Sequence, residues 1–183
     1  CQVRADFHPP IADIQHDVII NPKMAFGTGH HATTYMMIEH MSEIDFHGKK
    51  VLDFGCGTGI LAILASKCGA ANIDAIDIEH ESYLNTIENA EINDIENVVS
   101  IEGELDAAPS TKYDIILANI NRNILQKYSA DLSSMLNPSG HLLTSGILEE
   151  DSQQMIKTFT AEEIQHLKKL ARDGWCSLTF IAE

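Results

Sequence analysis

Residues 51–59 read Val51-Leu52-Asp53-Phe54-Gly55-Cys56-Gly57-Thr58-Gly59, a short apolar run that leads into three alternating glycines. The pattern predicts a buried strand, a tight turn and then a helix, because residues 60–68 are rich in Ala and Leu and are followed by Gly69. Glycines in such a turn adopt positive φ angles and let a ligand approach the backbone closely. Strand, turn and helix in this order place that ligand at the carboxyl edge of a parallel sheet.

The rest of the chain alternates between strand-like and helix-like segments. Apolar runs predict strands over 50–54, 72–78, 98–101, 113–119 and 141–145. Helical spacing predicts helices over 33–44, 60–68, 82–93, 124–136 and 149–159. In the helix over 82–93, we expect Leu84, Ile87 and Ile92 to face the core. The alternation indicates an α/β, Rossmann-like fold, a mostly parallel sheet with helices on both faces.

The two ends of the chain depart from this alternation. Residues 1–30 contain several prolines and glycines and predict a lead-in of loops and short strands, one of them near 18–20, before a domain over 31–183. At the other end, residues 164–171 have helical spacing, but Asp173-Gly174 is a strong hairpin signal and 175–181 is strand-like. We therefore expect a closing hairpin there.

Composition and charge narrow the class of protein. With 27 acidic and 12 basic side chains the net charge is −15, which disfavours direct binding to nucleic acid. The same charge would attract a lysine-rich protein, or it keeps the domain soluble and does no more. No apolar run is long enough to cross a membrane and the first residues lack a signal-peptide pattern, so we expect a cytoplasmic protein. The four cysteines and nine histidines show no metal-ligand spacing, and we expect no metal site.

The spacing of the glycines and the residue before them favour one cofactor. Gly55, Gly57 and Gly59 form GxGxG, with Ile60 where the third glycine of the dinucleotide pattern GxGxxG would stand. The carboxylate of Asp53 would repel a pyrophosphate but suits a cationic ligand. S-adenosylmethionine carries an ammonium and a sulfonium and no phosphate, so it is favoured over NAD or FAD. The alternative is a turn that only connects strand to helix.

Two further carboxylate positions fit an adenosine ligand. Asp77 ends the second predicted strand, about 20 residues after the turn, where a carboxylate can accept hydrogen bonds from both ribose hydroxyls. The alternative for Asp77 is a solvated loop residue. Glu102 and Glu104 follow the third strand and could reach the adenine amino group, although a plain surface role is favoured for both.

The candidate catalytic residues are Asn119 and Ile120, at the end of the fourth predicted strand. A carboxamide and adjacent backbone carbonyls at this sheet edge can accept hydrogen bonds from an amine and align its lone pair on a methyl donor. The alternative for Asn119 is a cap for the following helix. No residue stands out as a general base, so solvent is left as the proton acceptor.

Several motifs together give the chain a resemblance to a known family. They are Phe26-Gly27-Thr28-Gly29-His30-His31-Ala32-Thr33-Thr34, residues 51–63, Ile76-Asp77-Ile78, Ala118-Asn119-Ile120, residues 145–148 and residues 174–176. From about Phe26 to the C-terminus the chain resembles the catalytic domain of the ribosomal protein L11 methyltransferases, within the class I S-adenosylmethionine-dependent methyltransferases. The resemblance implies a seven-stranded sheet whose last strand is antiparallel. It also implies N-methylation of lysine or N-terminal amino groups of a large-subunit ribosomal protein.

The resemblance also implies roles for particular residues. Thr34, Gly55, Asp77 and Asn119 would contact the cofactor, with Gly57 of the same turn. Phe26 would pack at the cofactor pocket, and the loop at Thr28 would border the substrate entrance.

One departure from the family bears on the substrate. Family members usually carry an additional N-terminal domain that grips the ribosomal protein, and this sequence does not include it. Either the sequence is a trimmed part of a longer protein, or the protein recognises something else; we expect cofactor binding to survive that difference better than substrate capture. The alternatives are a small-molecule methyltransferase on the same fold and a non-catalytic module that binds S-adenosylmethionine. An NAD-dependent oxidoreductase is disfavoured by Asp53 and the GxGxG spacing. The sequence makes no prediction of an oligomeric state.

Overall fold

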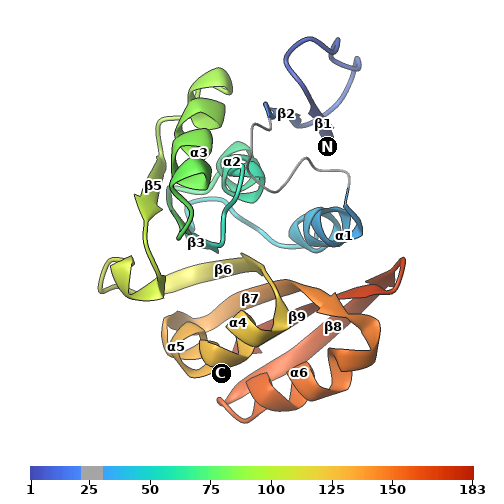
Figure 1. Cartoon of the computed structure of the whole chain (residues 1–183), viewed down its shortest axis with the longest axis vertical. Coiled ribbons are helices and arrows are strands. Elements are labelled where there is room, and N and C mark those ends of the chain that lie inside the picture. The colour runs from blue at the N-terminus through green and yellow to red at the C-terminus, as the bar shows by residue number, and fades with distance from the viewer. Residues whose placement is uncertain (22–30) are drawn as a thin grey trace.

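The chain folds around one seven-stranded sheet (Figure 1). The structure is a computed structural model, and it describes residues 1–21 and 31–183. The strand order is β5-β4-β3-β6-β7-β9-β8, where β5-β4-β3-β6-β7 are parallel and β9 pairs antiparallel with both β7 and β8. The strands are β3 (Lys50–Phe54), β4 (Asn72–Asp77), β5 (Val98–Glu102), β6 (Tyr113–Asn119), β7 (Leu136–Leu148), β8 (Ile164–Arg172) and β9 (Trp175–Ala182). The mostly parallel Rossmann-like sheet with an antiparallel last strand is confirmed.

Helices cover both faces of the sheet (Figure 1). One face carries α1 (Ala32–Met41), α2 (Ile60–Lys67) and α3 (His80–Ile92). The other carries α4 (Arg122–Lys127), α5 (Ser129–Ser134) and α6 (Ser152–Thr160), with short 3-10 turns at η1 (Leu105–Ala107) and η2 (Glu149–Asp151). Each face has its own buried core, one around α1 and α2 and the other around α5 and α6. The sheet is thus buried on both sides, which accounts for its nearly continuous apolar strands.

The region between β6 and β7 differs from the expected single helix over 124–136. The helix divides at Tyr128, whose backbone angles (φ −107°, ψ 15°) leave the helical range. Strand β7 then begins at Leu136, which is buried and pairs with Tyr113 of β6. The expected helix end was wrong because pairing and burial of Leu136 against the sheet compete with helical propensity there.

The expected core face of α3 is also wrong. Leu84 and Ile92 are 40% and 38% exposed, and Ile87 is only half-buried. The buried positions are instead Ser82, Asn85, Thr86, Asn89 and Ala90. Asn85, Thr86 and Asn89 bind backbone groups of two neighbouring segments, which apolar side chains could not do.

The structure of the two chain ends agrees in outline with what the sequence predicts. In the lead-in, β1 (Gln2–Arg4) and β2 (Asp17–Ile19) form a small parallel pair, joined by an ion pair of 2.7 Å between Arg4 and Asp17. The expected C-terminal hairpin is present as β8 and β9 around Asp173-Gly174. The proposed boundary between 1–30 and 31–183 falls beside residues outside the described part and stays a prediction. None of the helices in 1–21 and 31–183 is long and apolar enough to span a membrane.

Candidate functional site

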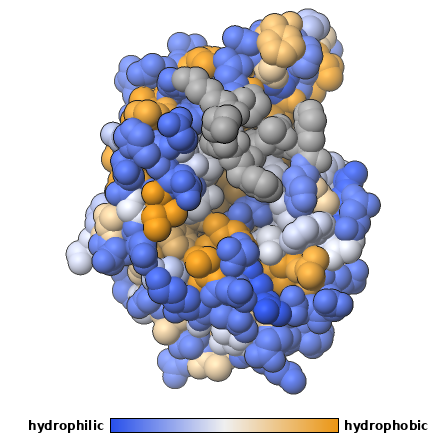
Figure 2. Space-filling model, viewed as in Figure 1, coloured by the Kyte–Doolittle hydropathy of each residue, from blue (hydrophilic) through white to orange (hydrophobic). Residues whose placement is uncertain are grey.

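A cavity of about 820 Å³ opens at the carboxyl ends of β3, β4 and β6. Strand β3 pairs with β4 on one side and with β6 on the other. Successive strands of the chain are therefore added on one side of β3 up to β5 and on the other side from β6 onward. Such a switch point leaves a crevice in which α/β proteins bind ligands. In the view of Figure 2, hydrophobic side chains gather near the middle of the molecule and hydrophilic ones surround them.

The glycine turn forms one wall of the cavity. Gly55 and Gly57 line it, and the backbone N–H groups of Gly55 and Cys56 donate to the carbonyl of Ile76 at 2.8 and 3.0 Å. Gly55 has φ +75°, and a Cβ at this position would lie 2.1 Å from Cγ2 of Ile120. Ile120 therefore packs directly on the turn, and only glycine permits that approach. The strand–turn–helix predicted from the sequence is confirmed.

Asp77 stands at the end of β4 and joins that strand to the turn. One carboxylate oxygen accepts a hydrogen bond from the Gly57 N–H at 2.9 Å, and the other accepts one from the Glu79 N–H at 3.0 Å. The side chain also lines the cavity. Each carboxylate oxygen keeps a further acceptor site, so Asp77 can still receive hydrogen bonds from a ligand.

Asp53 is placed differently from the other predicted residues. It is 1% exposed and is not part of the cavity lining; it lies on the α2 side of β3, where it accepts a 3.0 Å hydrogen bond from the N–H of Ala62 in the first turn of α2. Its second oxygen is buried and has no partner among the described residues. Burial raises the pKa of the Asp53 carboxyl to about 7, against the hydrogen bond from Ala62, which lowers it; the charge of Asp77 raises it further.

Asn119 reaches the cavity from the opposite side, at the end of β6. Its side-chain N–H donates to Oγ1 of Thr34, which is buried on α1, at 3.4 Å. The cap of the next helix is Asn121, whose side chain accepts from the N–H of Ile124 at 3.1 Å. Because Asn121 serves as the cap, that alternative does not apply to Asn119. The predicted residues Thr34, Gly55, Gly57, Asp77, Asn119 and Ile120 all line one cavity.

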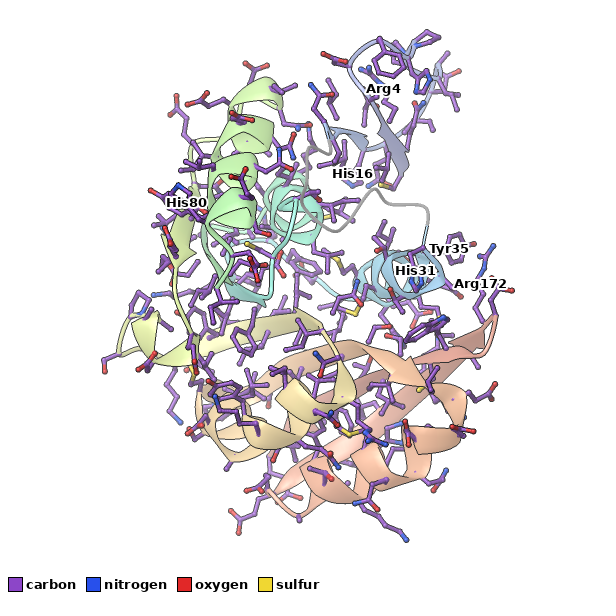
Figure 3. The ribbon with its side chains drawn as sticks, viewed as in Figure 1. Arg4, His16, His31, Tyr35, His80 and Arg172 are labelled. Carbon is purple, nitrogen blue, oxygen red and sulfur yellow. The ribbon has the colours of Figure 1, made fainter. Side chains whose placement is uncertain are left out.

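Two aromatic rings at this end were not singled out from the sequence as site residues. His31 caps α1 by accepting a 3.3 Å hydrogen bond from the Thr33 N–H, and its ring stands edge-on to Trp175 with centroids 5.2 Å apart. Both rings line the cavity. Beside them, Arg172 lies 4.0 Å over the ring of Tyr35, and Figure 3 shows Tyr35, His31 and Arg172 close together. No local pattern reveals this group, because α1 and the β8–β9 hairpin lie far apart in the sequence.

The opposite end of the cavity carries a polar cluster. Glu104 accepts hydrogen bonds from the Tyr128 hydroxyl and from Nζ of Lys127, the latter at 2.9 Å. The bond from Tyr128, followed by that from Lys127, holds the pKa of the Glu104 carboxyl below its usual range. Tyr128 also packs edge-on against Phe54, with ring centroids 5.4 Å apart. Glu102 does not join this cluster, since it binds His80 at 2.7 Å.

Phe26 and Thr28, which the resemblance placed at the pocket and the substrate entrance, lie outside the described residues. Within 1–21 and 31–183, no three His, Cys, Asp or Glu side chains come together in a group that could hold a metal ion.

Comparison with known proteins gives the site its context. The family described as ribosomal protein L11 methyltransferase (PrmA) matches residues 7–183. The chain belongs to the ribosomal protein L11 methyltransferase family. Over 181 residues it is 44% identical to the ribosomal protein L11 methyltransferase of Porphyromonas gingivalis. This alignment covers 98% of this chain and 62% of that protein. The protein of that name from Phocaeicola vulgatus is 37% identical, with 99% of this chain and 65% of that protein covered.

A solved structure shares the fold in detail. The ribosomal protein L11 methylase of Lactobacillus delbrueckii subsp. bulgaricus superposes with a TM-score of 0.88 at 31% identity, covering 97% of this chain and 91% of that one. The resemblance inferred from the motifs is thus confirmed at the level of family and class I methyltransferase fold. The chain spans 62% and 65% of the lengths of the two curated relatives named above.

Proposed function

We propose that this chain is an S-adenosylmethionine-dependent N-methyltransferase domain that acts on lysine or N-terminal amino groups of a ribosomal protein. The observation that carries the proposal is one cavity with Asp77 on one wall and Asn119 on another. Asp77 suits the hydroxyls of a nucleoside, whereas Asn119 suits an amine. The names of the relatives in this family support ribosomal protein L11 as the substrate.

The residues present fit the cofactor. The nucleoside would lie at the end with Asp77, where the exposed side chain of Ile78 provides an apolar surface. Asp77, Glu79, Glu81 and Glu104 line this end and would repel a phosphorylated nucleotide, with Lys127 already paired to Glu104. Asp53 lies under the turn and outside the cavity lining, so it supports the turn and does not contact the ligand directly. When bound, S-adenosylmethionine supplies an activated methyl group.

The acceptor amine would enter at the other end of the cavity. Oδ1 of Asn119 has no hydrogen-bond partner among the described residues and can accept from an amine N–H. The carbonyl of Ile120 is less suited to this, because it lies against Gly146, where a Cβ would approach it to 2.4 Å. We therefore assign the orienting role to Asn119 and the shaping of the wall to Ile120. His31 and Trp175 would flank the apolar stem of a lysine.

The amine must lose its proton before it attacks. Of the described lining residues at this end, His31 is the only imidazole, and its Nδ1 already accepts a hydrogen bond at the start of α1. Water is then the proton acceptor. Catalysis rests on proximity and alignment, which suffice for an in-line displacement at a methyl group.

The acidic character of the chain agrees with a lysine-rich protein partner. Its net charge of −15 attracts basic proteins and disfavours direct contact with nucleic acid. We further propose that residues 31–183 form the methyltransferase domain, that residues 1–30 are its lead-in, and that the protein works in the cytoplasm.

The proposal is tested by transfer of labelled methyl groups from S-adenosylmethionine to purified ribosomal protein L11. We expect labelled lysine or N-terminal residues, located by mass spectrometry, and loss of transfer with Asn119→Ala. Since the relatives are longer, the assay includes this chain and a version extended to their full length. Bound cofactor without any transfer by the extended version would contradict the proposal, and label in a metabolite instead would indicate a small-molecule methyltransferase.

A further inference from the structure

Most side chains on the buried face of α3 are polar. A helix that covers a sheet normally buries apolar side chains instead. Asn89 is 0% exposed and Asn85 1%, while Leu84 on the outer face is 40% exposed. Burying a carboxamide is costly unless its donor and acceptor both find partners. The partners of these side chains therefore indicate what the polar face is for.

One set of partners is the glycine turn. Oγ1 of Thr86 donates to the carbonyl of Gly57 at 3.1 Å, and Nδ2 of Asn89 donates to the carbonyl of Thr58 at 2.9 Å. The N–H of the same Gly57 binds Asp77, and Gly57 lines the cavity. Side chains of α3 therefore bind the carbonyl groups of the turn, while Asp77 binds one of the N–H groups of the turn.

The other set of partners lies in the lead-in, at Ile19 and Asn21. Asn93 both accepts from the N–H of Ile19 at 2.9 Å and donates to its carbonyl at 2.7 Å. Two residues on, the carbonyl of Asn21 accepts from Nδ2 of Asn85 at 3.0 Å, and the N–H of Asn21 donates to Oδ1 of Asn89 at 3.0 Å. These bonds fasten the lead-in along α3.

Asn89 belongs to both sets. Its Nδ2 serves the turn and its Oδ1 serves the lead-in, and no other α3 side chain binds both segments within the part of the chain that the structure describes. The two bonds also determine the orientation of the carboxamide, because a flipped group would set N–H against N–H. A shorter polar side chain cannot span the two partners.

We propose that Asn89 is a positioning residue. It couples the hydrogen-bonded attachment of Asn21 to α3 with the geometry of the glycine turn, and through the turn with the affinity for the cofactor. The last step rests on the proposed function. When the Asn21 N–H is displaced, the carboxamide of Asn89 loses one of the two bonds that orient it. The carbonyl of Thr58 then loses a fixed donor, and the turn beside Asp77 loosens.

The first test measures the affinity for S-adenosylhomocysteine by calorimetry. Asn93→Ala releases Ile19 outside the cavity, and we expect it to weaken binding about fivefold in the wild-type background. In an Asn89→Ser background we expect Asn93→Ala to change the affinity by less than about 1.5-fold, because the connection is already broken. Thr86→Val, which acts on the turn itself, should still weaken binding in the Asn89→Ser background. An unchanged affinity for Asn93→Ala, or the same loss in both backgrounds, overturns the coupling.

The second test needs no ligand and no Asn89 variant. Hydrogen exchange of the Asn21 amide is followed in the wild type and in Thr86→Val, whose side chain makes no bond to Asn21. We expect the amide to exchange about threefold faster or more in Thr86→Val, because loosening the turn frees Asn89. Unchanged exchange would overturn the inference even if Asn89→Ser fails to fold. If the wild type binds no S-adenosylhomocysteine, the proposed function fails while this test of the coupling still stands.

Discussion

The two ends of the cavity are built in different ways. The end with Asp77 is rich in carboxylates, and its residues come mainly from one stretch of chain around β3, β4 and η1. The end with Asn119 combines uncharged and aromatic groups from three distant elements, α1, β6 and β9. The first end suits a ligand shared by a whole class of enzymes, and the second suits a particular acceptor. Variants at one end should therefore leave the other end unaffected.

The largest effect is expected beneath the Asp77 end, at Asp53. Its folded-state pKa of about 7 lies above the ordinary value of 3.8, so the folded protein binds more protons than the unfolded chain between these values. The contribution of Asp53 to stability must fall as pH rises through this window, by on the order of 4 kcal/mol. Relative to Asp53→Asn, the wild type should lose free energy of unfolding from pH 4 to 7, measured with urea. A difference that does not change with pH would contradict the assignment.

Gly146 lies between the two ends of the cavity, and we expect a side chain at this position to destabilise the fold. It has φ +81°, and a Cβ would lie 2.4 Å from the carbonyl oxygen of Ile120. Gly146→Ala combines backbone strain with a clash that only the main chain can relieve, so we expect a loss of about 3 kcal/mol in the free energy of unfolding. Gly174→Ala is the matched control, because Gly174 has φ +79° but nothing within 4 Å, and should cost about 1 kcal/mol. Equal losses would show that Ile120 does not pack there.

Asp77→Ala should act on the cofactor end alone. It removes the acceptors of the Gly57 and Glu79 N–H groups as well as those offered to a ribose. We expect the affinity for S-adenosylhomocysteine to fall by about 2 kcal/mol in calorimetry. Glu81→Gln changes a charge on the same rim and should have little effect. An unchanged affinity in Asp77→Ala would rule out the ribose assignment.

Trp175→Ala should impair the reaction with the protein acceptor and leave cofactor binding unchanged. We expect a decrease of about tenfold in kcat/KM for the protein acceptor, because the apolar wall beside His31 is lost. Binding of S-adenosylhomocysteine should stay within about twofold of the wild type. Leu148→Ala, at an exposed residue that pairs with Trp175 outside the cavity lining, is the control. A loss of cofactor affinity in Trp175→Ala would remove the distinction between the two ends.

The sequence predicts the arrangement of the end with Asp77 well, because the residues of this end lie within one strand–turn–helix unit and the next strand. Gly55, Gly57 and Asp77 meet there by local connection. His31 and Trp175 escape prediction, because only the packing of the hairpin on α1 brings them together. Asp53 was found but misplaced: as strand side chains alternate between faces, it points under the turn while Phe54 lines the cavity.

The helices give the same lesson. The helix α6 buries Met155 and Phe159 against the sheet, as a helical apolar pattern predicts. The helix α3 also packs beside β4 and β5, but it exposes Leu84 and Ile92, because its buried side chains face a turn and a lead-in whose backbone groups need hydrogen bonds. Apolar periodicity predicts the face that packs on a sheet but not a polar face that binds the backbone of loops. The asparagines at 85, 89 and 93, four residues apart, were the signal that could have revealed the buried face.

The central claim is that the cavity binds S-adenosylmethionine rather than a dinucleotide, and calorimetric titration with S-adenosylhomocysteine and with NAD tests it most directly. We predict saturable binding of S-adenosylhomocysteine at one site, with Asp77→Ala weakening it, and no measurable binding of NAD to a rim lined by Asp77, Glu79 and Glu104. Binding of NAD as tight as that of S-adenosylhomocysteine, or no binding of either, would contradict the account.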